Sequence, residues 1–125
     1  MSTVLVIDSQ ESVRCLIRHM LEPVGYEVVE AAHAQEALDI GGSRLFDIVM
    51  MDLVQPAKQG LDALMSIRRS FPQSKIVAMA GRALPTADML ETSRLFGAQA
   101  TLLTPFAPDT LFKVLATLWR WRAAA

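Results

Sequence analysis

Cysteine, excess basic charge and long apolar runs are all scarce in this sequence. Cys15 is the one cysteine among 125 residues, which excludes an internal disulfide and favours a reducing compartment. Its neighbours Leu16 and Met20 predict a thiol packed within a helix. No apolar run approaches the roughly 20 residues of a membrane span, and no export signal precedes the first strand-forming residues. We therefore expect a cytoplasmic protein with no membrane segment.

Acidic and basic residues are nearly balanced, at 13 and 12, so the formal net charge is −1. A protein that binds nucleic acid through its phosphates needs a basic surface, and the composition offers no such excess. We expect no nucleic-acid partner. The length suits one domain with one core, and no repeat or linker interrupts the chain. Residues 1–125 are therefore predicted to form a single domain.

Five runs of strand-forming residues alternate with five segments of helical spacing. The predicted strands are 4–7, 27–31, 48–51, 75–79 and 100–103, and the predicted helices are 11–21, 35–40, 61–70, 87–96 and 109–122. The first, third and fourth strands are almost wholly apolar, as in sheets covered on both faces. The alternation predicts an α/β fold, a (βα)5 flavodoxin-like three-layer sandwich with a parallel five-stranded sheet.

Two carboxylates, Asp8 and Asp52, close the first and third apolar runs. A buried carboxylate costs free energy that a core does not require. In open parallel sheets, ligands bind beyond the carboxyl ends of the strands, where the strand order reverses. With the common order 2-1-3-4-5, these two strands are neighbours and the carboxylates face each other. Such a pair favours a bound cation, a shared proton or a basic partner.

The sequence around Asp52 carries the most specific motif. Met51-Asp52-Leu53-Val54-Gln55-Pro56 is followed by Gly60-Leu61, so a proline lies four and a glycine eight residues after the aspartate. Supporting motifs are the run 4–8 that ends in Asp8, Phe96-Gly97-Ala98 and Pro105-Phe106. Along its whole length the chain resembles the receiver domain of two-component response regulators.

The resemblance implies roles for these residues. Asp52 would accept a phosphoryl group from a histidine kinase or phosphotransfer protein. Asp8, Asp52 and the backbone carbonyl of Val54 would hold Mg²⁺. The peptide bond before Pro105 would be cis.

The family pattern is broken at four positions. In place of a second acidic residue, a Ser/Thr, a Lys and a switch aromatic, the chain has Ser9, Ala80, Thr104 and Thr101 respectively. We expect weak Mg²⁺ binding, slow or poorly sustained phosphorylation, and an ineffective switch.

One anion and one cation are lost together, so the summed pocket charge is unchanged and the pocket is interpreted as rebuilt as a unit. Ser9 is predicted to be the N-cap of the first helix. Lys58 and Arg82 are interpreted as solvated charges on the rim rather than replacement cations. His19 and His33 have no ligand-type spacing, so neither is predicted to be a metal or catalytic residue.

The last predicted helix has a wide apolar arc. Leu111, Val114, Leu115 and Leu118 should pack on the sheet, and Phe112, Trp119 and Trp121 border them. By resemblance, the helix 87–96, the strand 100–103 and the helix 109–122 would form a surface for a homodimer or a downstream protein.

The leading hypothesis is a stand-alone atypical receiver, not an enzyme, that acts by protein–protein interaction with weak or absent phosphorylation control. Since the sequence ends three alanines after Arg122, we expect no output domain. The alternative is a working phosphorelay acceptor through Asp52. A remote alternative is a flavodoxin-like cofactor binder or an Mg²⁺-dependent phosphatase. Loop 9–12 lacks a glycine-rich phosphate cradle, and the second aspartate that a phosphatase needs is replaced by Gln10 or Val54.

Overall fold

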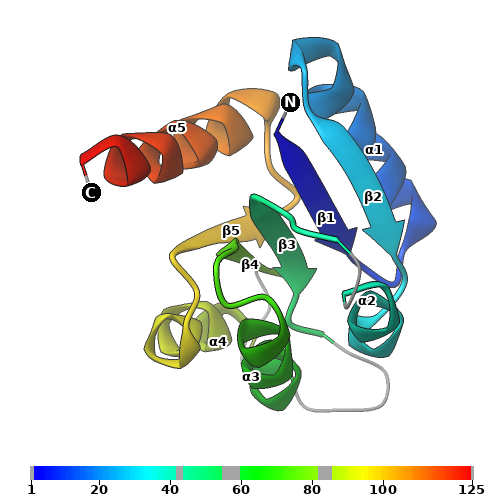
Figure 1. Cartoon of the computed structure of the whole chain (residues 1–125), viewed down its shortest axis with the longest axis vertical. Helices are drawn as coiled ribbons and strands as arrows, with labels where there is room; N and C mark the ends of the chain where they lie inside the picture. The colour runs from blue at the N-terminus through cyan, green and yellow to red at the C-terminus, as the bar shows by residue number, and fades with distance from the viewer. Residues whose placement is uncertain (1, 42–43, 55–59, 82–85, 125) are drawn as a thin grey trace.

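A parallel sheet lies between two layers of helices in the computed structural model (Figure 1). The structure describes residues 2–41, 44–54, 60–81 and 86–124, and the side chains of these residues except 86, 87 and 119–124. The strands are β1 (Thr3–Ile7), β2 (Glu27–Ala31), β3 (Ile48–Asp52), β4 (Lys75–Gly81) and β5 (Ala100–Thr104). Their order is β2-β1-β3-β4-β5, so the predicted fold and strand order are confirmed.

Helices follow the strands in alternation. They are α1 (Glu11–Leu21), α2 (Ala34–Ile40), α3 (Gly60–Ser70), α4 (Thr86–Ser93) and α5 (Pro108–Ala124), with short 3-10 helices η1 (Glu22–Val24) and η2 (Arg94–Phe96). The prediction of one helix over 87–96 is wrong in its last turn. There Gly97 donates its N–H to the carbonyl of Arg94 and takes a φ of 112°, a left-handed conformation that glycine adopts readily.

The two faces of the sheet pack against different helices. Val4 and Val6 belong to the core shared with α1 and α5, whereas Leu5 and Ile7 belong to the core shared with α2, α3 and α4 (Figure 1). Successive side chains of a strand point to opposite faces, so β1 must be apolar at every position. This two-sided burial explains the continuous apolar runs.

Two features of α1 and α2 differ from the sequence predictions or add to them. The thiol of Cys15 is exposed, so its predicted burial is wrong; the buried side of α1 is formed by Ile17 and Leu21. His33 is the N-cap of α2 and accepts a hydrogen bond from the N–H of Glu36, at 3.2 Å between Nδ1 and N.

The start of α3 is held close to the end of β3. A Cβ atom added to Gly60 would lie 1.8 Å from the carbonyl oxygen of Leu53, so only glycine fits this approach. No helix in the described ranges is long and apolar enough to cross a membrane.

Candidate functional site

Asp8 and Asp52 come together at the carboxyl edge of the sheet. Ile7 of β1 lies opposite Met51 of β3, so the residues that follow them occupy neighbouring strand ends. Asp8 is only 4% exposed, and Asp52 is half-buried. The predicted juxtaposition of the two carboxylates therefore exists in the fold.

Each carboxylate accepts a backbone hydrogen bond two residues further along the chain. The N–H of Gln10 donates to Asp8 Oδ1 at 2.8 Å, and the N–H of Val54 donates to Asp52 Oδ1 at 2.9 Å. These Asx-type turns direct one oxygen of each side chain toward its own loop. Ser9 lies exposed inside the first turn. The predicted N-cap role of Ser9 is wrong, because the N-cap of α1 is Gln10, which makes no side-chain capping bond.

The pair is electrostatically unfavourable when both carboxylates are ionised. The pKa of Asp52 is raised to about 6: burial raises it most, the hydrogen bond from the Val54 N–H lowers it, and the nearby charge of Asp8 raises it. Burial also raises the pKa of Asp8, whereas the hydrogen bond from the Gln10 N–H and the charge of Arg14 act to lower it. Because Asp8 has a guanidinium close by, we expect Asp52 to hold a shared proton longer.

Arg14 was not identified from the sequence, yet it joins Asp8 to a chain of ion pairs. Its Nη1 donates to the backbone oxygen of Asp8 at 2.6 Å, and its Nε donates to Glu30 Oε1 at 3.0 Å. Glu30 Oε2 in turn accepts from Arg18 Nη2 at 2.7 Å, and Arg18 Nη1 lies 2.6 Å from Glu22. The network fixes α1 and the β1–α1 loop against β2. The i, i+4 spacing of Arg14 and Arg18 was the available signal, since it places both on one helix face.

The other predicted pocket positions lie at the ends of β4 and β5. Ala80 is 1% exposed and follows Met79, which lies opposite Asp52 in the sheet register. Thr104 lies opposite Gly81 at the end of β5, and its peptide bond to Pro105 is cis, as predicted.

The switch position, Thr101, lies near the start of β5, three residues before Thr104. The hydroxyl of Thr101 accepts a long hydrogen bond of 3.5 Å from Arg94 Nη2. Lys58 and Arg82 lie outside the described residues, and so do Gln55 and Pro56.

The carboxylate pair suits a hard cation. Mg²⁺ binds oxygen ligands and is usually held by one or two carboxylates, with waters and phosphate oxygens completing its shell. Asp8 and Asp52 supply such carboxylates, and a cation would relieve the unfavourable charge that raises the pKa of Asp52. Within the described ranges, no group of three or more His, Cys, Asp or Glu side chains could hold a metal ion. The site thus fits Mg²⁺ with a small protein ligand set.

Of the three interface residues predicted on α5, the structure describes the side chain of Phe112 alone. Leu111, Leu115 and Leu118 are buried, which confirms the predicted packing face, and Phe112 packs partly buried beside them. The side chains of Trp119 and Trp121 lie outside the described residues.

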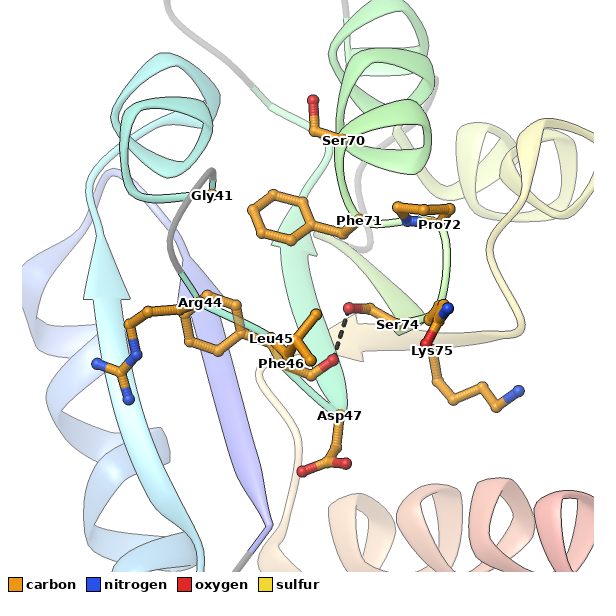
Figure 2. A pocket seen from close by; sticks show the side chains of 11 residues that line it. Gly41, Arg44, Leu45, Phe46, Asp47, Ser70, Phe71, Pro72, Ser74 and Lys75 are labelled. Carbon is orange, nitrogen blue, oxygen red and sulfur yellow. Dashed lines mark hydrogen bonds between the residues drawn. The ribbon is translucent and has the colours of Figure 1, made fainter.

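A hollow of about 490 Å³ lies at the opposite edge of the sheet, between the loops before β3 and β4 (Figure 2). Phe46 and Phe71 pack there in a T-shaped pair, with ring centroids 5.9 Å apart. Ser74 Oγ donates to the carbonyl of Phe46 at 2.6 Å, and the Arg44 guanidinium lies 5.4 Å from the Phe46 ring centroid while pairing with Glu27. These internal contacts identify the hollow as a structural junction that joins the two loops.

The family is shown by comparison with known proteins. The model of the response regulator receiver domain matches residues 4–116, so the chain belongs to this family. It is therefore a receiver domain of two-component signalling. Receiver domains are in general non-enzymatic signalling modules that interact with histidine kinases or phosphotransfer proteins and bind Mg²⁺ in an acidic pocket.

Individual relatives agree with this assignment. The chain is 32% identical over 115 residues to the transcriptional regulatory protein PdtaR of Mycobacterium tuberculosis. The aligned region covers 90% of this chain and 54% of that protein. The chain thus spans about half the length of this relative.

Two solved structures share the fold. The chemotaxis protein CheY4 of Vibrio cholerae superposes with a TM-score of 0.82 at 29% identity, covering 94% of this chain and 98% of that one. The response regulator TrrA of Thermotoga maritima, in complex with Mg²⁺ and BeF, superposes with a TM-score of 0.78 at 26% identity, covering 94% and 99%.

Proposed function

We propose that this receiver domain acts mainly by binding protein partners, with weak or absent control by phosphorylation of Asp52. The observation that carries the proposal is the buried methyl group of Ala80, at the strand end beside Asp52. It offers no hydroxyl to a phosphoryl group. Thr104, at the end of β5, offers no positive charge. Phosphoryl transfer depends on charge stabilisation, so both replacements reduce the yield of phosphorylated Asp52.

In this proposal Asp52 is the phospho-acceptor, and Asp8, Asp52 and the Val54 carbonyl hold Mg²⁺. When bound, the ion supplies positive charge between the carboxylates and the phosphoryl oxygens. Ser9 provides a neutral oxygen where a third anionic ligand would strengthen binding, so the affinity is low. The Val54 N–H and the Gln10 N–H orient the carboxylates before any ion arrives.

Loss of the switch follows from the same residues. A ligand shifts a conformational equilibrium only by contacts that differ between the two states. Ala80 has no hydroxyl to move, and Thr101 is a small side chain that accepts a hydrogen bond from Arg94. A phosphoryl group on Asp52 therefore gains little differential contact.

A partner surface is available on α4, β5 and α5. A hollow of about 620 Å³ lies there, with Leu90, Leu103, Phe106 and Val114 among its lining residues. We place a downstream protein or a second copy of the chain on this face, and Phe112, Trp119 and Trp121 of α5 remain the candidate interface residues.

Self-association through this face has a direct test. Changing Trp119 and Trp121 to Ala should lower the mass measured by light scattering. If the mass is unchanged, self-association through these residues is wrong.

Intact-mass spectrometry tests the proposal as a whole. The chain is incubated with Mg²⁺ and acetyl phosphate, beside Asp52→Asn and the matched control Asp62→Asn, which changes an exposed carboxyl on α3. Ala80→Thr with Thr104→Lys is a gain-of-function arm. We expect little adduct in the unchanged chain and more in the double variant, lost when Asp52→Asn is added. A high, stable yield in the unchanged chain would contradict the proposal and favour a phosphorelay acceptor.

A further inference from the structure

Exposed apolar and cationic side chains gather where the second half of α3 meets η2. We call this the α3–η2 surface, defined by Met65, Arg68, Arg69, Leu95 and Phe96. They line a hollow of about 400 Å³. Leu95 is 84% exposed, Met65 38% and Phe96 36%. Single exposed apolar side chains are ordinary, but three around one hollow indicate an interaction site.

The charge of this surface is not neutralised by carboxylates of the described residues. Among the described residues, Arg14, Arg18 and Arg44 form ion pairs with glutamates, whereas Arg68 forms none. Arg68 instead donates to neutral oxygens, those of Phe71 at 2.5 Å and Ser74 at 2.6 Å.

The neighbouring arginines add to the positive charge. Arg69 is exposed, and within the described ranges Arg94 donates to the neutral oxygens of Gln99 and Thr101. The surface therefore presents the guanidinium groups of Arg68 and Arg69 beside apolar side chains, and Arg94 adds positive charge from the residue before Leu95.

The base of the hollow is closely packed. Gly97 takes a φ of 112°, and a Cβ at this position would lie 2.6 Å from Arg68 Cδ, so the aliphatic part of Arg68 packs directly on the turn. Arg68 Nη1 also donates to the Gly97 carbonyl at 3.2 Å. A preformed site loses less conformational entropy when it binds a partner.

The α3–η2 surface is remote from the carboxylate pair. The helix α3 begins beside the end of β3 and returns to the opposite edge of the sheet, where β4 begins at Lys75. η2 reaches the same edge just before β5. A partner on this surface can therefore bind whatever the state of Asp52.

We infer that the α3–η2 surface docks an acidic segment of a partner protein, with an apolar side chain inserted into the hollow. Carboxylates on the segment would pair with the exposed Arg69 and approach the partly buried charge of Arg68. The concave shape fits one or two inserted side chains better than the flat surface of a bilayer. The apolar lining distinguishes the site from one for a small inorganic anion. Electrostatic complementarity then selects acidic over basic segments.

The test is amide chemical-shift mapping on the ¹⁵N-labelled full chain, which detects weak binding. Two short amphipathic peptides serve as probes, matched in length and leucine positions, with glutamate or lysine at all other positions. We expect the glutamate peptide to shift the amides of Met65, Leu95, Phe96 and Gly97, and the lysine peptide to leave them unchanged. Leu95→Ser and Arg69→Glu should each weaken binding by about tenfold or more.

Matched variants control for general effects. Leu45→Ser removes a leucine that is 87% exposed on another loop, and Lys113→Glu reverses an exposed charge on α5. Both should bind like the unchanged chain. Absence of shifts with the glutamate peptide, equal shifts with the lysine peptide, or insensitivity to Leu95→Ser would each overturn the inference. If the chain sediments with anionic vesicles and does not bind the peptide, the surface would instead be a membrane-binding site. A mass increase on concentration that Leu95→Ser abolishes would replace it with a second copy.

Discussion

Asp52→Asn should stabilise the folded chain at neutral pH, and the gain should vanish in acid. Burial and the charge of Asp8 raise the pKa of Asp52 from 3.8 to about 6. The folded chain therefore holds a proton between about pH 4 and pH 6 that the unfolded chain releases, so stability falls as pH rises through this window. Above pH 6 the ionised carboxylate carries its full cost. Asparagine resembles the neutral acid and does not incur that cost.

The size of the effect follows from the shift. About 2 pKa units at 1.36 kcal/mol each give an upper limit of about 3 kcal/mol. Asp52 is only half-buried, and solvent screens part of its interaction with Asp8, so we expect about 1–2 kcal/mol at neutral pH. Near pH 4 the unchanged chain and the variant should differ by less than about 0.5 kcal/mol.

The assay is urea unfolding followed by circular dichroism at several pH values between about 4 and 8, without Mg²⁺. The informative quantity is the difference in free energy of unfolding between Asp52→Asn and the unchanged chain, plotted against pH. Asp62→Asn is the matched control, since it exchanges a carboxyl that is exposed rather than half-buried. A difference that is constant with pH, or a pH profile that Asp62→Asn reproduces, would refute the electrostatic reasoning.

Three further predictions concern the same edge of the sheet. Ser9→Asp with Thr104→Lys should be tolerated better than either single change, because only the double variant keeps the pocket charge; equal unfolding free energies for all three would show that the positions are not coupled. Arg14→Met should lower the free energy of unfolding by about 1–2 kcal/mol, because it removes the hydrogen bonds to Asp8 and Glu30. The control Arg69→Met breaks no ion pair among the described residues and should change the free energy of unfolding by less than about 0.5 kcal/mol. Mg²⁺ should raise the midpoint of thermal unfolding at neutral pH but not near pH 4, where Asp52 is protonated. The rise at neutral pH should be smaller in Asp52→Asn, and an equal rise at both pH values would place the ion elsewhere.

The sheet and the carboxylate pair were predictable because they depend on patterns within single segments. Apolar runs covered on both faces define β1, β3 and β4, and an aspartate at the end of two of them marks the edge. The predicted end of the fourth strand was too early. Ala80 and Gly81 have low strand propensity, yet both pair with β5 residues, and this pairing is invisible in the local sequence.

Other features depend on contacts between elements that are distant in sequence. Arg14 and Glu30 are separated by a helix and a turn, and only the packing of α1 on β2 brings them together. The exposure of Cys15 depends on the rotation of α1 about its axis, which its buried face sets. The α3–η2 surface needs the end of α3 and η2 to meet, although each contributes few residues. Such features follow from tertiary geometry, which periodicity does not encode.

The exposed thiol of Cys15 gives this chain a natural attachment point. Because it is the one cysteine in the sequence, a maleimide spin label or fluorophore would react at a single position without any prior substitution. The label would sit on α1, one turn from His19, whose Nδ1 lies 3.5 Å from the sulfur. Paramagnetic broadening from that position would then measure how close a bound partner lies to α1, separately for each proposed docking surface.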